Sequence, residues 1–182
     1  LTPLDPLDQV GPKTPVINTG KAFTIAVGPE LLGRVVNSLG EPIDGKGDLN
    51  CLHNYPVRSS APSAMKRRRI KSNITVGIRA IDVLLTTGEG QRVGVFSTAG
   101  VGKSSLLGMI ARHSTADVNV VALVGERGRE VLEFLEENLG TEGLARSVVV
   151  VSTSNETPLR RIMAAYSATA IAEYFRDQGK RV

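Results

Sequence analysis

The sequence of 182 residues predicts an α/β fold in which helices pack on a parallel β-sheet. Three observations predict it. Strand and helix signals alternate from about residue 73, the runs at 119–124 and 148–151 are apolar throughout except for Asn119, and a glycine-rich turn at 97–104 joins a strand to a helix. Apolar runs of this length are typical of strands buried on both faces of a parallel sheet. Alternating strands and helices build such sheets through right-handed crossovers.

The composition excludes several classes of protein. With 41% hydrophobic and 22% charged residues, the chain has the make-up of a soluble globular domain, and no apolar run approaches the ~20 residues that cross a bilayer. The single cysteine, Cys51, cannot form an internal disulfide and suits a reducing cytosol. The polar, proline-rich beginning lacks Met and shows no signal segment, so we expect residue 1 not to be the native start.

The first 72 residues favour strands and turns. Runs at 16–20, 23–28 and 31–36 are β-prone, and residues 41–45 form a turn signal. Residues 50–72 combine prolines and basic residues without periodicity, which predicts a linker wrapped over the surface. Its basic run at 66–71 could contact nucleic acid or acidic lipid. We interpret it as a solvated loop, and expect no nucleic-acid partner, because no aromatic residue beside it could stack on bases.

Helical spacing of apolar residues predicts three helices after residue 90. The first spans about 103–113 and follows a strand at 92–96, and the second spans about 129–139 and stops before Gly140. The residues that these two helices should direct inward are Leu106, Leu107, Ile110, Val131, Leu132 and Leu135.

The third predicted helix is long. Thr157 caps it, Pro158 takes its first position and Gly179 ends it. Residues 180–182 look like the opening of a fourth strand, so we expect the sheet of this chain to be truncated.

The turn STAGVGKS at 97–104 fits the phosphate-binding pattern G-x-x-x-x-G-K-[ST], the Walker A motif, apart from Ser97 at its first position. Its glycines let backbone N–H groups approach phosphate oxygens, and the helix start adds unpaired donors. Lys103 can reach the β- and γ-phosphates, and the Ser104 hydroxyl can ligate magnesium. We therefore expect ATP and Mg²⁺ here. The predicted contact residues are Thr98, Ala99, Gly100, Val101, Gly102, Lys103, Ser104 and Ser105.

A second motif, GERGRE at 125–130, directly follows the apolar run 119–124. Ligands of open parallel sheets bind at the carboxyl ends of the strands, so Glu126 should emerge at the same edge as the phosphate loop. A carboxylate there can orient or deprotonate the water that attacks the γ-phosphate, and Arg127 can balance phosphate charge or hold Glu126 in place. The alternative is an exposed helix start, where acidic residues are favourable in any case.

Several motifs occur in a fixed order along the chain. They are LGRVV at 32–36, PIDG at 42–45, TVGIRAID at 75–82, GEGQR at 88–92, GVGKS at 100–104, GERGRE at 125–130 and AEYFRDQGKRV at 172–182. Together they resemble the type III secretion and flagellar protein-export ATPases, relatives of the ATP synthase β subunit. The resemblance covers nearly the whole chain after residue 15.

The resemblance implies a RecA-like P-loop NTPase domain within a hexameric, cytoplasmic ring that uses ATP to drive protein export. Export-apparatus proteins, chaperones and cargo would be its partners, and peripheral association with the inner face of the membrane would also fit. It implies trailing strands of an N-terminal β-barrel in 1–28, linker strands and a loop in 29–72, and an incomplete RecA-like domain in 73–182.

The same resemblance assigns roles to individual residues. Lys103 would bind phosphate, Ser104 magnesium, Glu126 would be the catalytic base, and Arg127 would lie near the γ-phosphate. Thr98 stands where these ATPases usually have glycine, which could narrow the loop.

Three other functions share parts of the pattern. Catalytic subunits of rotary ion-translocating ATPases also have a P-loop and a Gly-Glu-Arg turn, but GREV at 128–131 and RDQGKRV at 176–182 favour export. A Rho-like RNA helicase would suit the basic run but lacks the GERGRE motif, and RNA-stimulated hydrolysis would identify it. Hydrolysis by the full-length protein would exclude a scaffold that only binds nucleotide.

Overall fold

The computed structural model describes residues 3–5, 7–8, 10–98 and 100–182. Its strands are β1 (Thr24–Val27), β2 (Val35–Asn37), β3 (His53–Pro56), β4 (Asn73–Ile74), β5 (Thr87–Gly88), β6 (Asn119–Val124) and β7 (Ser147–Ser152). Its helices are α1 (Arg79–Leu84), α2 (Lys103–His113), α3 (Gly128–Glu133), α4 (Gly140–Ala145) and α5 (Pro158–Asp177). Shorter turns are η1 (Pro29–Leu31) and η2 (Ala64–Lys66), and η3 (Phe134–Leu139) is a π-helix.

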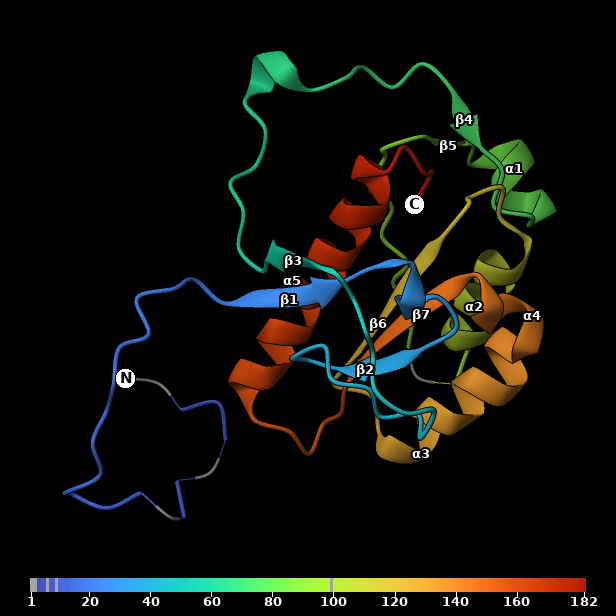
Figure 1. Cartoon of the computed structure of the whole chain (residues 1–182). Helices are drawn as coiled ribbons and strands as arrows, with labels where there is room; N and C mark the ends of the chain where they lie inside the picture. The colour runs from blue at the N-terminus through green and yellow to red at the C-terminus, as the bar shows by residue number, and fades with distance from the viewer. Residues whose placement is uncertain (1–2, 6, 9, 99) are drawn as a thin grey trace.

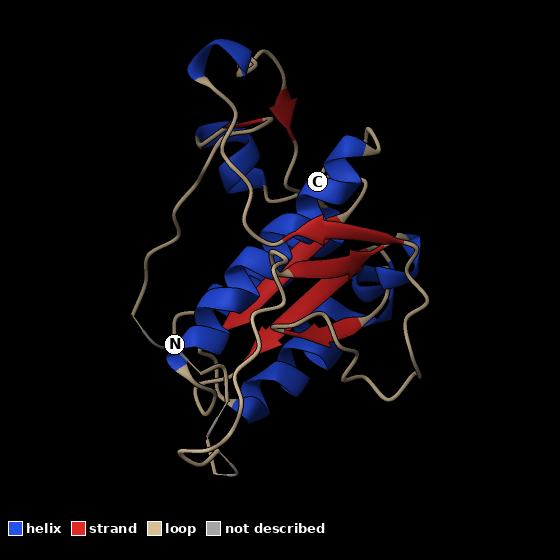
Figure 2. Cartoon of the chain, turned by 60° about the vertical axis from the view of Figure 1, so that its left-hand side comes forward, coloured by secondary structure: helices blue, strands red, loops and turns tan. Residues whose placement is uncertain are grey.

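A three-stranded parallel sheet with the order β2-β7-β6 forms the centre of the fold. Successive residues of β7 point to opposite faces, so Val148 and Val150 pack with α5 while Val149 and Val151 pack with α2 and η3. Figure 1 and Figure 2 show this arrangement, with the long α5 on one face of the sheet and α2, α3 and α4 on the other. The α/β fold with a parallel sheet is therefore confirmed.

The two predicted central strands differ in burial. All of β7 is buried, as predicted, because β2 and β6 flank it on both sides. Within β6, only Leu123 is buried and Val124 is 39% exposed, so the prediction of burial on both faces is wrong for this strand. The reason is that β6 lies at the edge of the sheet in the described part of the chain.

The N-terminal part contributes two pieces of sheet. β1 pairs antiparallel with β3, and its Ile25 and Val27 are buried in the cluster that includes α5. β2 joins the parallel sheet beside β7, with Val36 opposite Val150. The run at 16–20 forms no strand in the described structure, since its apolar side chains find no packing partner and Ile17 is 82% exposed.

Several predicted elements after residue 90 need correction. The run 92–96 is assigned no strand in the described structure, and Phe96 is 96% exposed. The helix at 103–113 is confirmed, although Leu107 is largely exposed. The next helix breaks at Gly140 as predicted, but α4 follows at once, and Leu132 faces solvent instead of the core. Leu107 and Leu132 are exposed because the core reaches only one side of each of these helices.

The long helix α5 begins as its sequence predicts. Pro158 is its first residue, and the Thr157 hydroxyl oxygen accepts a hydrogen bond from Arg160 N at 3.4 Å. The helix ends at Asp177, two residues before Gly179, which has a φ of +79°. Residues 180–182 are not assigned as a strand, although the Arg181 carbonyl accepts hydrogen bonds from Asp117 N and Val118 N. None of the helices in the described part of the chain combines the length and apolar character that crossing a bilayer requires.

Candidate functional site

The two sequence motifs meet at one edge of the sheet. α2 begins at Lys103, and Glu126 follows the carboxyl end of β6. The Lys103 ammonium nitrogen lies 4.0 Å from Glu126 Oε1, and both side chains remain partly exposed. The structure therefore brings together two of the predicted catalytic residues, which are 23 positions apart in the sequence.

The glycines before Lys103 give the loop its shape. Gly100 has a φ of +81° and Gly102 a φ of +89°, in the left-handed region that side chains disfavour. Within the described part of the chain, no atom lies within 4 Å of where a Cβ would stand at either position. A ligand can therefore approach the backbone of the loop closely. This backbone lies ahead of the positive end of the α2 dipole, an environment that favours phosphate.

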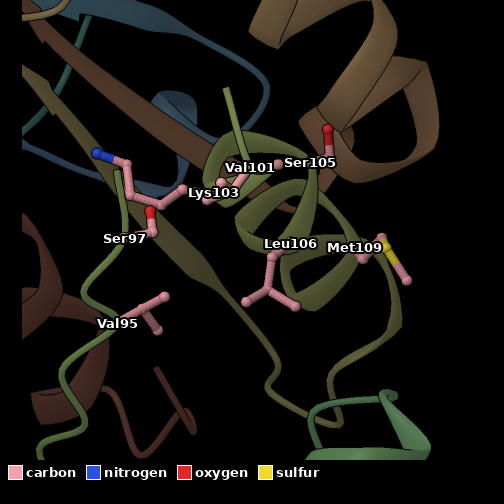
Figure 3. A pocket seen from close by; sticks show the side chains of 8 residues that line it. Val95, Ser97, Val101, Lys103, Ser105, Leu106 and Met109 are labelled. Atoms are coloured by element: carbon pink, nitrogen blue, oxygen red, sulfur yellow. The ribbon is translucent and has the colours of Figure 1, made fainter. Parts of the chain in front are cut away.

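A shallow hollow of about 330 Å³ opens beside the start of α2 (Figure 3). Val95 and Ser97 line it from the extended segment before the loop, and Leu106 and Met109 line it from α2. Gly102, Lys103 and Ser105 also line it. Anionic phosphates fit these polar groups better than the apolar side chains.

The remaining predicted contact residues lie in the loop or at the start of α2. Thr98 and Val101 are exposed in the loop, and Ser104 and Ser105 are exposed in the first turn of the helix. Ala99 lies outside the described residues. The described residues contain no cluster of three His, Cys, Asp or Glu side chains able to hold a metal. The Ser104 hydroxyl suits magnesium, which protein sites commonly bind through few side chains plus substrate phosphates.

Backbone hydrogen bonds fix the position of Glu126. Gly125 N donates to Ser152 O at 2.7 Å, and Ser154 N donates to Glu126 O at 3.0 Å. These bonds join the ends of β6 and β7 and hold the residue that carries the carboxylate against the sheet.

Arg127 is directed along its own helix. Its guanidinium donates to Glu130 Oε1 at 2.8 Å, and this hydrogen bond lowers the pKa of the Glu130 carboxyl below its usual value. The sequence patterns assigned no role to Glu130, although the spacing of three residues between Arg127 and Glu130 is one at which helical side chains meet. They also missed Ser97 and Met109 as lining residues of the hollow, because the extended segment and α2 meet only in the tertiary structure.

Known proteins similar to this chain identify its family. Residues 77–182 match the ATP synthase alpha/beta family, nucleotide-binding domain. The type 3 secretion system ATPase of Xanthomonas euvesicatoria is 53% identical over 182 residues, 100% of this chain and 41% of that protein. The flagellum-specific ATP synthase of Bacillus subtilis is 53% identical over 174 residues, 96% of this chain and 40% of that protein.

Solved structures give the same relationship. A prototypical ATPase from the type III secretion system of pathogenic bacteria superposes with a TM-score of 0.83 at 46% identity, over 87% of this chain and 46% of that one. The assembled ATPase EscN of enteropathogenic E. coli, in complex with its central stalk EscO, also gives 0.83, at 47% identity over 88% of this chain and 40% of EscN. The chain thus spans about 40% of the length of its curated relatives. It belongs to the ATP synthase α/β family, and within that family it is similar to the type III secretion and flagellar export ATPases.

Proposed function

We propose that this chain is part of an ATPase that hydrolyses magnesium-bound ATP to drive protein export through a type III secretion or flagellar apparatus. The observation that supports it most is the Lys103–Glu126 pair, 4.0 Å apart at the mouth of the glycine-rich loop. This proximity supports the roles of Lys103 as the phosphate-binding cation and Glu126 as the base beside the loop that would hold the γ-phosphate. The names of the similar proteins support the export role.

Binding would begin at the loop. The backbone N–H groups of residues 100–104 and the Lys103 ammonium would bind the phosphates, and the Ser104 hydroxyl would ligate magnesium, which neutralises phosphate charge. Because Lys103 lies within ion-pair distance of Glu126, phosphates that attract the ammonium would leave the carboxylate to act on water. Glu126 would then accept a proton from water as the water oxygen bonds to the γ-phosphorus and the bond to the β–γ bridging oxygen breaks.

Arg127 would act after release from Glu130. Its guanidinium is 69% exposed, so a γ-phosphate could compete for it without unfolding α3. The geometry therefore supports a role for Arg127 that depends on nucleotide binding. Ser105 and Thr98 complete the proposed loop contacts.

The relatives support a proposal for the assembly and location of the protein. We infer a hexameric ring, because the similar ATPase EscN is known in an assembled form, with export-apparatus proteins, chaperones and cargo as partners. We place it in the cytoplasm, with peripheral association at the membrane. Residues 1–28 would belong to an N-terminal β-barrel, 29–72 to a linker and 73–182 to the nucleotide domain.

Glu126→Gln in the full-length protein tests the proposal. The amide keeps the shape of the carboxylate and loses its basicity, so ATP binding should persist while kcat falls by roughly 10²–10⁴, the usual contribution of a general base. Glu30→Gln, an exposed glutamate in η1 outside the site, is the matched control and should retain wild-type turnover. Wild-type kcat in Glu126→Gln would show that this residue is only a helix-start residue.

A further inference from the structure

A strongly basic loop stands away from the body of the protein. We define the basic loop as residues 60–71; its cations are Lys66, Arg67, Arg68, Arg69 and Lys71, and all are exposed. No Asp or Glu occurs between Arg58 and Asp82. In the structure described, none of these five cations forms an ion pair. Figure 1 shows the loop, in teal and green, as an arc beyond the sheet.

Both ends of the basic loop are fixed to the fold. Before it, the Arg58 guanidinium lies 5.1 Å from the centre of the Tyr166 ring, and Ser59 Oγ donates to Glu173 Oε2 at 3.0 Å. After it, Ser72 Oγ donates to Glu89 Oε2 at 2.8 Å. The loop is therefore held at defined points on both sides, unlike a free tail.

An acidic surface lies elsewhere on the molecule. Between Glu130 and Ala145 the chain has five glutamates and neither Lys nor Arg. We define the acidic helical face by the four of these that are exposed and without an ion pair in the described structure: Glu133, Glu136, Glu137 and Glu142 on α3, η3 and α4. Figure 1 shows α3 and α4 at the opposite end of the molecule from the η2 turn of the basic loop.

We propose that the basic loop of one copy of this chain docks on the acidic helical face of the next copy. This inference rests on the assembly proposed above and names the surfaces that form it. The two patches are complementary in charge and lie apart on one chain, which favours their pairing between copies. Two different patches that pair head to tail generate a ring when the rotation closes.

Apolar side chains accompany the charges on both surfaces. Met65 is 95% exposed and Ile70 54% exposed in the basic loop, and Leu132 is 61% exposed next to the acidic helical face. Interfaces of proteins usually have an apolar centre within a polar rim. Met65, Ile70 and Leu132 would bury apolar surface at the interface between copies, while the charges would set the orientation of the two copies and raise their association rate.

Charge reversal in the full-length protein tests the pairing. Reversing the loop with Arg67→Glu, Arg68→Glu and Arg69→Glu, or the helical face with Glu133→Lys, Glu136→Lys and Glu137→Lys, should raise the half-assembly concentration at least tenfold by analytical ultracentrifugation. Combining all six changes should restore assembly. The control triple Lys13→Glu, Lys21→Glu and Lys180→Glu has the same charge change as the loop triple and should assemble like the wild type.

A cross-link gives an independent measurement if a triple variant fails to fold. Arg68→Cys with Glu137→Cys, in a Cys51→Ser background, should give disulfide-linked multimers on oxidation. Either single-cysteine variant should give no ladder beyond dimers. Absence of the ladder, wild-type assembly of both triples, or failure of the six-fold variant to recover would overturn the proposal.

The same variants separate other outcomes. If the loop triple assembles normally but loses binding to phosphatidylserine vesicles, the loop is a lipid-binding surface and our inference is wrong. If the wild-type protein assembles through these surfaces but does not hydrolyse ATP, the proposed function fails and the inference stands.

Discussion

Gly108 sets how closely α2, the helix that begins at the phosphate loop, approaches η3. A Cβ added at Gly108 would lie 2.7 Å from the carbonyl carbon of Asn138, inside van der Waals contact. The obstacle is backbone, which cannot rotate away as a flexible side chain could. The Arg112 guanidinium donates to the same Asn138 carbonyl oxygen, so separation of the helices would also disturb that hydrogen bond.

We therefore predict that Gly108→Ala destabilises the protein. Overpacking a tight contact costs about 1–3 kcal/mol, and a collision with backbone belongs in the upper part of that range. Alanine gains roughly 1 kcal/mol over glycine in a helix, which leaves a net loss of about 1–2 kcal/mol. At about 2–4 °C per kcal/mol for a domain of this size, Tm should fall by about 2–8 °C.

Thermal unfolding followed by circular dichroism measures the effect, with Gly128→Ala as the matched control. Gly128 also lies in a helix, and no described atom is within 4 Å of its Cβ position, so alanine there should leave Tm unchanged or raise it slightly. Equal Tm values for the two variants would show that Gly108 does not determine the helix separation.

Three further predictions concern ligand binding, pH and chain length. Lys103→Ala should weaken binding of ATP far more than of adenosine, because the ammonium serves only the phosphates; equal losses in calorimetric titration would contradict the assignment. Asp44→Asn should cost about 1.5–3 kcal/mol of stability near neutral pH, the range for hydrogen bonds to charged groups. The Arg34 guanidinium beside it, 2.8 Å away, holds the pKa of the Asp44 carboxyl well below its usual 3.8. Because its pKa is lowered in the folded state, the charged Asp44 stabilises the fold above about pH 4, and this contribution is lost as the pH falls further. The difference in Tm between the wild type and Asp44→Asn should therefore persist above about pH 4 and shrink below it. A difference that does not depend on pH would refute this account. Residues 1–182 alone should release phosphate far more slowly than the full-length protein, which would form the proposed ring. In related NTPases an arginine supplied by a neighbouring subunit raises kcat by roughly 10³–10⁵. Comparable turnover from both would show that the rest of the protein is dispensable.

The sequence by itself determined the elements whose signals are local. The Gly-Lys-Ser turn before a helix, the Thr157 cap with Pro158, the break at Gly140 and the apolar run of β7 all depend on neighbouring residues. Backbone geometry and side-chain chemistry act over a few positions in such cases, so the order of residues suffices to predict them.

Only the tertiary structure decided which distant segments meet. β2 joins β7 across more than 100 positions, 16–20 and 92–96 remain unpaired in the described structure, and β6 is at an edge where burial on both faces was expected. The site shows the same division: the sequence predicted Lys103 and Glu126 singly, while their 4.0 Å approach required the packing of α2 beside β6. Strand pairing and helix docking depend on partners far along the chain, whose order no local pattern specifies.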